Sequence, residues 1–210
     1  MENAPLNRSA FGPTRRDAYP IMHRFLLARD LAAQQDVLLI GNAPPEGVAL
    51  VAETSKSLTW VLPDSQEMQQ IPGVRIIQTR SCTEWLLSEN DEFGLVAGFG
   101  IGQVLTIDDN VEALFDAVRH RLRDRGQALL SFSGTPSFSA HLSSDNKGMR
   151  PDLAVRHILE KAFTNVRLLG QGTYSVSLML PLEGRGSGGL STFAVSNEQV
   201  DGTRDFNEYI

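Results

Sequence analysis

Asp36-Val37-Leu38-Leu39-Ile40-Gly41, followed by Asn42-Ala43-Pro44-Pro45-Glu46-Gly47, is the stretch of sequence that decides the fold. The apolar run before Gly41 is typical of a strand buried on both faces of a parallel sheet. Gly41 begins a turn, and residues 47–54 are predicted to form a helix. In such a strand, glycine turn and helix, backbone amides meet anionic or nucleotide ligands. Pro44 and Pro45 stand inside this turn, and proline has no N–H to donate. The stretch therefore predicts a ligand site whose loop offers fewer backbone N–H donors than such a turn usually does.

Short apolar strands alternate with helices along most of the chain. We predict strands at 37–40, 58–62, 74–79, 93–99 and 128–133, and helices at 17–33, 47–54, 66–70, 82–87, 110–123 and 152–162. This alternation is typical of a doubly wound α/β fold, with a mostly parallel sheet between two layers of helices. Residues 174–182 and 192–196, around the Gly-rich stretch 183–191, predict a closing antiparallel hairpin. The polar residues 134–150 are predicted to form a loop or lid.

The clearest helix is predicted over Asn110–Arg123. One face carries apolar side chains at helical spacing, namely Val111, Leu114, Phe115, Val118 and Leu122. Asp108 or Asp109 is the expected N-cap, because a short carboxylate side chain accepts hydrogen bonds from the first amides of a helix. Gly126 is the expected stop. We therefore expect this face to pack on the sheet.

Composition limits the classes of function. The 210 residues fit one domain, which we place at 15–197, after an irregular arm at 1–14 and before a polar tail at 198–210. The net charge of −6 argues against nucleic-acid binding. One cysteine, Cys82, excludes an internal disulfide and a cysteine-based zinc cluster, and no histidine pair has metal-ligand spacing, so no metal is expected. The chain has no signal core and no run of 18 apolar residues, which predicts a cytoplasmic protein without membrane contact.

Four stretches carry a likeness to a known family. They are Val37–Gly41, Val74–Gln78, Phe93–Val96, and Asp109–Phe115 continuing through Arg119, Arg121, Leu122 and Gly126 to Ala128–Phe132. Their order resembles the first strand and glycine loop, the third strand, the fourth strand, and the helix, turn and fifth strand of class I S-adenosylmethionine-dependent methyltransferases. The resemblance covers residues 15–197. It implies a three-layer Rossmann-like fold with a mostly parallel seven-stranded sheet and an antiparallel C-terminal hairpin.

The same resemblance implies where S-adenosylmethionine would bind. The family's G-x-G-x-G loop falls on Gly41, Asn42, Ala43, Pro44 and Pro45, so its second and third glycines are missing. In the family an acidic residue at the end of the second strand accepts hydrogen bonds from the ribose hydroxyls. Its counterpart here is Asp64, which lies beyond the end of that strand, after Pro63. The adenine contact falls on Arg80 or Ser81. Loss of one charge-assisted hydrogen bond costs about 1.5–3 kcal/mol. We therefore expect weak or absent binding of S-adenosylmethionine.

Each candidate site residue also has a structural interpretation. Asp64 is either the ribose acceptor or a turn residue after Pro63. Glu46 either replaces the lost acceptor or, as we favour, caps the following helix. Gly98, in the string Ala97–Gly102, either forms a side-chain-free wall for a flat ligand or allows close backbone packing. His141 is the best-placed general base because its unperturbed pKa is near neutrality, although an exposed loop histidine is the commoner case.

Two principal functions follow from these features. The loop prolines and missing acidic residues favour a methyltransferase-like protein with a degraded cofactor site, serving as a binding or partner module for a small molecule or a protein. The alternative is an active methyltransferase of a small molecule, which would hold its acceptor in line with the methyl group. A repurposed enzyme with cofactor-independent chemistry is less favoured. The sequence leaves a homo-oligomer open.

Overall fold

Five parallel strands form the central sheet, in the order β3-β2-β1-β4-β5. The computed structural model describes residues 15–64, 70–105, 110–133, 141–142, 148–149, 151–167, 170–171 and 208–209. Its elements are α1 (Arg15–Ala32), β1 (Asp36–Ile40), α2 (Pro45–Ala52), β2 (Ser57–Pro63), β3 (Val74–Thr79), α3 (Cys82–Ser88), β4 (Phe93–Gly98), η2 (Ile101–Gln103), α4 (Val111–Arg121), β5 (Leu122–Leu130), β6 (Phe132–Ser133), α6 (Pro151–Ala162), β7 (Gly170–Gln171) and β8 (Glu208–Tyr209).

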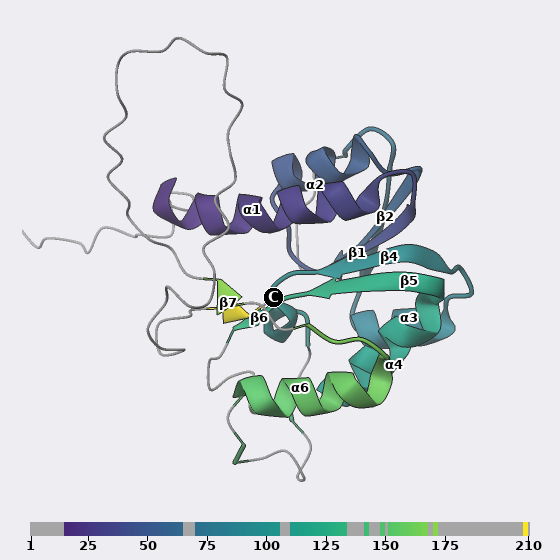
Figure 1. Cartoon of the computed structure of the whole chain (residues 1–210). Helices are drawn as coiled ribbons and strands as arrows, with labels where there is room; N and C mark the ends of the chain where they lie inside the picture. The colour runs from purple at the N-terminus through teal and green to yellow at the C-terminus, as the bar shows by residue number, and fades with distance from the viewer. Residues whose placement is uncertain are drawn as a thin grey trace, which may run out of the picture.

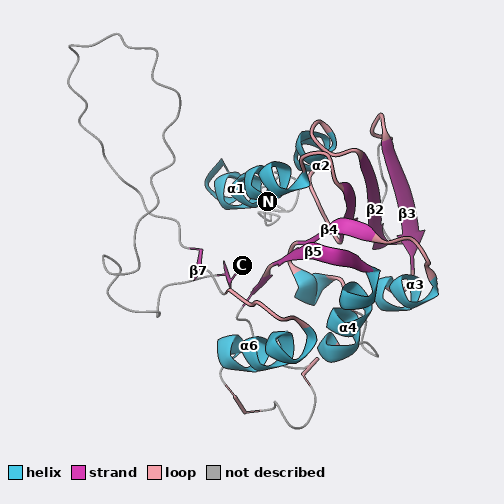
Figure 2. Cartoon of the chain, turned by 45° about the vertical axis from the view of Figure 1, so that its right-hand side comes forward, coloured by secondary structure: helices cyan, strands magenta, loops and turns pink. Residues whose placement is uncertain are grey.

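Helices cover both faces of this sheet. In both views α1 and α2 lie over one face, and α3, α4 and α6 lie over the other (Figures 1 and 2). The predicted three-layer α/β architecture with a parallel sheet is therefore confirmed. Strand β1 lies at the centre, where Val37 pairs with Leu58 on one side and with Leu95 on the other. The strand order reverses between β1 and β4, and such a switch point is where open α/β sheets bind ligands.

Part of the predicted fold lies outside the described residues. This applies to the strands at 174–182 and 192–196, to nearly all of the helix at 66–70 and to most of the loop at 134–150. Seven strands and a C-terminal hairpin therefore remain predictions. The described residues also form a small antiparallel sheet, in the order β6-β8-β7, in which Tyr209 pairs with Phe132 and with Gly170.

The boundaries of α4 differ from those predicted. Its N-cap is Asn110, whose side-chain oxygen accepts hydrogen bonds from the amides of Glu112 at 2.7 Å and Ala113 at 3.4 Å, so the prediction of Asp108 or Asp109 was wrong. The helix ends at Arg121, and Gly126 does not stop it. Leu122 is already extended and pairs with Phe93, and the β4–β5 register then shifts before Leu95. The chain passes directly from the helix into the sheet. Because Leu122 pairs with Phe93 and Gln127 with Leu95, the residues between Leu122 and Gln127 form an irregularity within β5.

The hydrophobic core has two parts, one on each face of the sheet. Leu114, Phe115 and Val118 of α4 are fully or almost fully buried in the part that also holds α3 and α6, as predicted. Leu122 is only partly buried and packs on this core from β5. On the other face, Phe25 of α1 belongs to the part formed with α2. The arrangement leaves the carboxyl edge of the sheet as the place where loops from different strands meet.

Candidate functional site

The turn at Gly41 is held from two sides. Gly41 has a φ of +95°, a conformation that favours glycine. Its amide donates to the Val61 carbonyl at 2.8 Å, and its carbonyl accepts from Nε1 of the buried Trp60 at 2.8 Å. A Cβ built on Gly41 would lie 2.8 Å from Cγ2 of Val104. Gly41 therefore makes the tight turn at the end of β1, and Val104 covers its open face.

Gly47 has a packing role. A Cβ built on it would lie 2.6 to 2.9 Å from three ring carbons of Phe25, so only glycine lets α1 approach α2 this closely. The Phe25 ring also meets the ring of Phe99 edge-on, with centroids 4.8 Å apart. In a nucleotide-binding loop the first glycine makes the turn, the second admits the ligand, and the third packs the helix on its neighbours. Gly41 makes the turn, whereas Gly47 lies inside α2 and serves the packing of α2 on α1.

The residues between these glycines are arranged around the start of α2. Asn42 is exposed and Ala43 is half-buried. Pro44 is the N-cap residue and Pro45 is the first helical residue. The amides of Gly47 and Val48 both donate to the Pro44 carbonyl, at 2.9 and 3.1 Å. Because Pro45 has no N–H and these two amides are engaged, the first turn of α2 offers few donors to a ligand.

Glu46 lies exposed in the first turn of α2. A carboxylate there interacts favourably with the positive end of the helix, but the N-cap residue is Pro44 and no side chain makes a capping hydrogen bond.

Asp64, Arg80 and Ser81 come together at the ends of β2 and β3. The Asp64 amide donates to the Thr79 carbonyl at 3.0 Å, so Asp64 extends the strand pairing beyond Pro63. Its carboxylate lies 3.9 Å from Nε of Arg80, with 56% of the Asp64 and 94% of the Arg80 side chain exposed. Such an exposed pair contributes little to stability. The buried Ser81 instead accepts a hydrogen bond from the Glu84 amide at 3.2 Å and caps α3.

Gly98 lies at the end of β4, where the side chain of Ile101 packs against it. A Cβ built on it would lie 2.7 Å from Cδ1 of Ile101, which agrees with the close-packing interpretation rather than with a ligand wall. Buried Ser131 ties this region to the end of β5. Its amide donates to the Gly98 carbonyl at 2.8 Å, its carbonyl accepts from the Ile101 amide at 2.9 Å, and its hydroxyl accepts from the Gly100 amide at 3.0 Å.

His141 lies beside the start of α4. It is half-buried, and its carbonyl accepts a hydrogen bond from the Val111 amide at 3.2 Å. Its neighbours at 134–140 and 143–147 lie outside the described residues. The role of His141 as a general base therefore stays a prediction.

Two residues at this edge were missed by sequence reasoning, namely Val104 and Ser131. Each is an ordinary apolar or small polar residue in its own segment, and the sequence carries no signal that it meets a distant glycine or strand end. The glycine string 98–102 indicated close packing, but not its partners.

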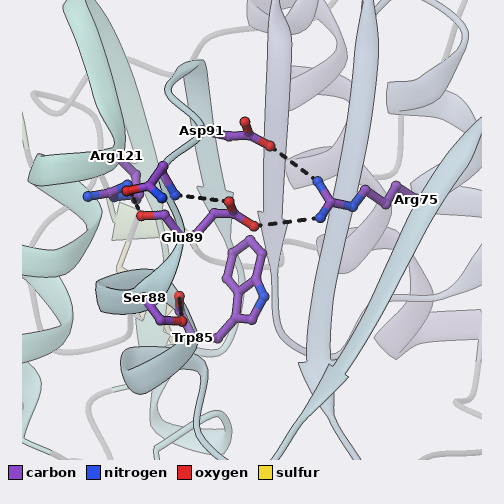
Figure 3. Close-up of polar contacts among 7 residues, drawn as sticks. Arg75, Trp85, Ser88, Glu89, Asp91 and Arg121 are labelled. Carbon is purple, nitrogen blue, oxygen red and sulfur yellow. Dashed lines mark hydrogen bonds and ion pairs between the residues drawn. The ribbon is translucent and has the colours of Figure 1, made fainter.

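Charged clusters lie at the opposite, amino edge of the sheet. Arg75 at the start of β3 lies 3.6 Å from the Glu89 carboxylate and 3.2 Å from that of Asp91, while Arg121 donates to the Glu89 backbone carbonyl (Figure 3). Asp36 has three partners of its own there, Ser57 at 2.7 Å, Arg123 at 2.7 Å and Lys56 at 3.1 Å. These contacts join the starts of β1, β2, β3 and β5 to one another and to the loop residues beside them.

Two features are absent from the described residues. They contain no group of three or more His, Cys, Asp or Glu residues placed to hold a metal ion. None of their helices combines the length and apolar character needed to cross a membrane.

Solved structures resemble this fold. N-methyltransferase NodS from Bradyrhizobium japonicum WM9 superposes with a TM-score of 0.56 at 15% identity, over 79% of this chain and 93% of that chain. The same protein in complex with S-adenosyl-L-homocysteine gives 0.56 at 14% identity, over 83% and 87%. Precorrin 8W decarboxylase from Methanobacterium thermoautotrophicum gives 0.50 at 12% identity, over 80% and 82%. No family model and no curated protein sequence matches the chain. At these identities the likeness is one of fold.

Proposed function

We propose that this chain, whose fold is that of the class I S-adenosylmethionine-dependent methyltransferases, has a degraded cofactor site and serves as a binding or partner module rather than as a catalyst. The observation that carries this proposal is the division of roles between the two glycines of the β1–α2 turn. The glycines that shape the backbone are kept, because Gly41 makes the turn and Gly47 admits the Phe25 ring. The positions of the family's second and third loop glycines hold Ala43 and Pro45 instead.

The residues present fit S-adenosylmethionine poorly. Its charged amino-acid portion needs amide donors at the start of α2, where Pro45 has none and Gly47 and Val48 donate to Pro44. Asp64 supplies a carboxylate for hydroxyl groups, but it faces the Arg80 guanidinium. Ser81 is used as a helix cap. Such a site retains one acceptor but has no amide donor at Pro44 or Pro45, so the frame persists with fewer contacts for the cofactor.

Titration calorimetry with S-adenosylmethionine and S-adenosylhomocysteine tests this proposal. We expect a dissociation constant no better than roughly 100 μM, so that 1 mM ligand would stabilise the fold by only ~1.4 kcal/mol. Methyl transfer should be undetectable with small-molecule acceptors. Low-micromolar binding would overturn the proposal. The variant Asp64→Ala then shows whether this carboxylate holds the ligand, and Arg80→Ala, which frees the carboxylate, is its matched comparison.

An active methyltransferase of a small molecule is the second candidate. It is favoured by the place of Asp64, whose amide donates to the Thr79 carbonyl at the end of β3 and whose carboxylate remains more than half exposed. His141 would be the general base in this case. Turnover that is lost in both Asp64→Ala and His141→Ala, with the fold intact by circular dichroism, would establish this candidate in place of the first.

A further inference from the structure

We infer that the outer edge of strand β3 is a self-association site, where β3 of a second copy of this chain pairs antiparallel and joins the two sheets into one. Strand β3 is the end strand of the five-stranded sheet and pairs with β2 on its inner side. Figure 2 shows it as the outermost strand, and no other described strand pairs with its outer side. The inference goes beyond the proposed function and involves none of the residues around the Gly41 turn.

The backbone of β3 shows which residues face the open edge. The Thr79 carbonyl accepts from the Asp64 amide at 3.0 Å, so Thr79 directs its backbone groups toward β2. Because the direction of these groups alternates along a strand, Arg75 and Ile77 face β2 as well, whereas Ile76 faces outward. The amide and the carbonyl of Ile76 are therefore placed to pair with a further strand.

The outer edge of β3 lacks the devices by which natural proteins protect an edge strand. Such edges carry prolines, bulges or unpaired charges that prevent another strand from adding. Residues Val74–Thr79 contain no proline or glycine, and their pairing with β2 has no register shift. Arg75 is the one charged residue, and its guanidinium lies 3.6 Å from the Glu89 carboxylate and 3.2 Å from that of Asp91 (Figure 3). Its charge is thus balanced within its own chain.

A two-fold axis through the edge makes the strand complementary to itself. In an antiparallel pair, directly opposite side chains lie on the same face of the sheet, so the axis must place a residue opposite its own copy. With the axis at Ile76, the two Ile76 residues exchange two backbone hydrogen bonds, and Arg75 lies opposite Ile77 of the second copy. No two like charges are directly opposite in this register, which favours the pairing.

Apolar side chains on both faces would be covered by the same pairing. Ile76 is partly buried against the core that holds α1 and α2. Ile77 and Trp85 are partly buried against the core on the α3 and α4 side. Cross-strand contacts between β-branched side chains stabilise a sheet, so the second copy would extend both cores across the interface.

Sedimentation of the full chain tests the inference. One chain has a mass of 23.0 kDa, and we expect particles of twice this mass to form reversibly as the concentration rises. A pair of short strands is at the small end of specific interfaces, so we expect a dissociation constant of roughly 1–100 μM. The Ile76 amide should exchange its hydrogen at least tenfold more slowly in the dimer, whereas that of Leu38 in the central strand should not depend on concentration.

Ile76→Pro removes the central donor of the interface. Proline is tolerated in an edge strand where the N–H faces away from the sheet, so the variant should keep its pairing with β2. We expect it to associate at least a hundredfold more weakly than the wild type. Ile76→Ala is the matched control, because it removes more of the side chain but keeps the amide, and it should associate within tenfold of the wild type.

Disulfide cross-linking tests the register. Opposite residues that exchange hydrogen bonds have Cα atoms about 5.5 Å apart, a distance that a disulfide spans. Ile76→Cys should therefore form a covalent dimer with oxidised glutathione. Gln78→Cys should not, since its copy would lie four residues along the strand. The native Cys82 is buried and serves as the background in both variants.

The outcomes decide for or against the pairing. A wild type that stays monomeric up to ~1 mM overturns it. A monomer whose Ile76 amide is protected at every concentration also overturns it, because another part of the same chain would then cover the edge. Equal association by the wild type and folded Ile76→Pro, or equal weakening by Ile76→Ala and Ile76→Pro, overturns strand pairing. If Ile76→Pro does not fold, the cysteine variants decide: cross-linking of Ile76→Cys but not Gln78→Cys supports the pairing, and any other pattern overturns it.

Discussion

Asp36 shows how one side chain links stability to pH. Hydrogen bonds from Ser57, Arg123 and Lys56 to its carboxylate lower the pKa of Asp36 from 3.8 to about 2. Because the folded-state pKa is depressed, this stabilisation is complete above the unfolded pKa near 4 and is lost as pH falls through about 2. We expect Asp36→Asn to lower the free energy of unfolding by about 2 kcal/mol at pH 7, with the difference from wild type shrinking between pH 4 and pH 2.

Denaturant unfolding across this pH range measures the effect. Asp124→Asn is the matched control, since it changes the charge equally on an exposed side chain beside Arg123. A loss in Asp36→Asn that stays constant from pH 7 to pH 2 would contradict the prediction.

Gly47 provides a second test, in which two effects have opposite signs. Alanine is favoured over glycine inside a helix by roughly 0.5–1 kcal/mol, so helix propensity alone would make Gly47→Ala stabilising. The added Cβ would instead meet the Phe25 ring at less than 3 Å. We expect the clash to dominate, with a net loss of roughly 1–3 kcal/mol. In the background Phe25→Leu the same change should cost less, and a double-mutant cycle that shows no coupling would refute the contact.

The apolar side chains predicted for one face of helix α4 contribute unequally to its packing. Phe115 is fully buried in α4, whereas Leu122 belongs to β5 and is partly exposed. We expect Phe115→Ala to lower the free energy of unfolding by about 3–5 kcal/mol, because the ring leaves a cavity that its neighbours fill only partly. Leu122→Ala should cost distinctly less. Urea unfolding measures both, and a loss below about 1 kcal/mol for Phe115→Ala would show that this side chain is not core.

The sheet predicts how stability is distributed through the molecule. Strand β1 is paired on both sides and its residues Val37–Ile40 are buried, whereas β3 pairs only with β2 among the described strands and is partly exposed. We expect the amides of β1 to exchange only through global unfolding, and those of β3 to exchange through smaller openings at lower free energy. Native-state hydrogen exchange in increasing denaturant distinguishes the two. Equal opening free energies for β1 and β3 would contradict this expectation.

The amino-acid sequence by itself determined the class of the fold and the order of its elements. A run such as Val37–Ile40 has no polar face, so it must be buried on both sides of a sheet, and the periodic apolar face of α4 needs a sheet to cover. These are local properties, which a window of neighbouring residues contains. The Pro44–Pro45 pair likewise revealed the loss of amide donors without any structure, since proline lacks an N–H wherever it lies.

Only the tertiary structure decided what each site residue contacts. Gly41 and Gly47 look alike in the sequence, yet Val104 covers one and Phe25 packs on the other, and both partners come from other segments of the chain. The same holds for Asp64 beside Arg80, and for Ser131 beneath Gly100. The end of α4 at Arg121 was set by pairing between Leu122 and Phe93, which overrode the local stop signal at Gly126. Contacts between distant segments depend on how the chain closes, and no local pattern encodes them.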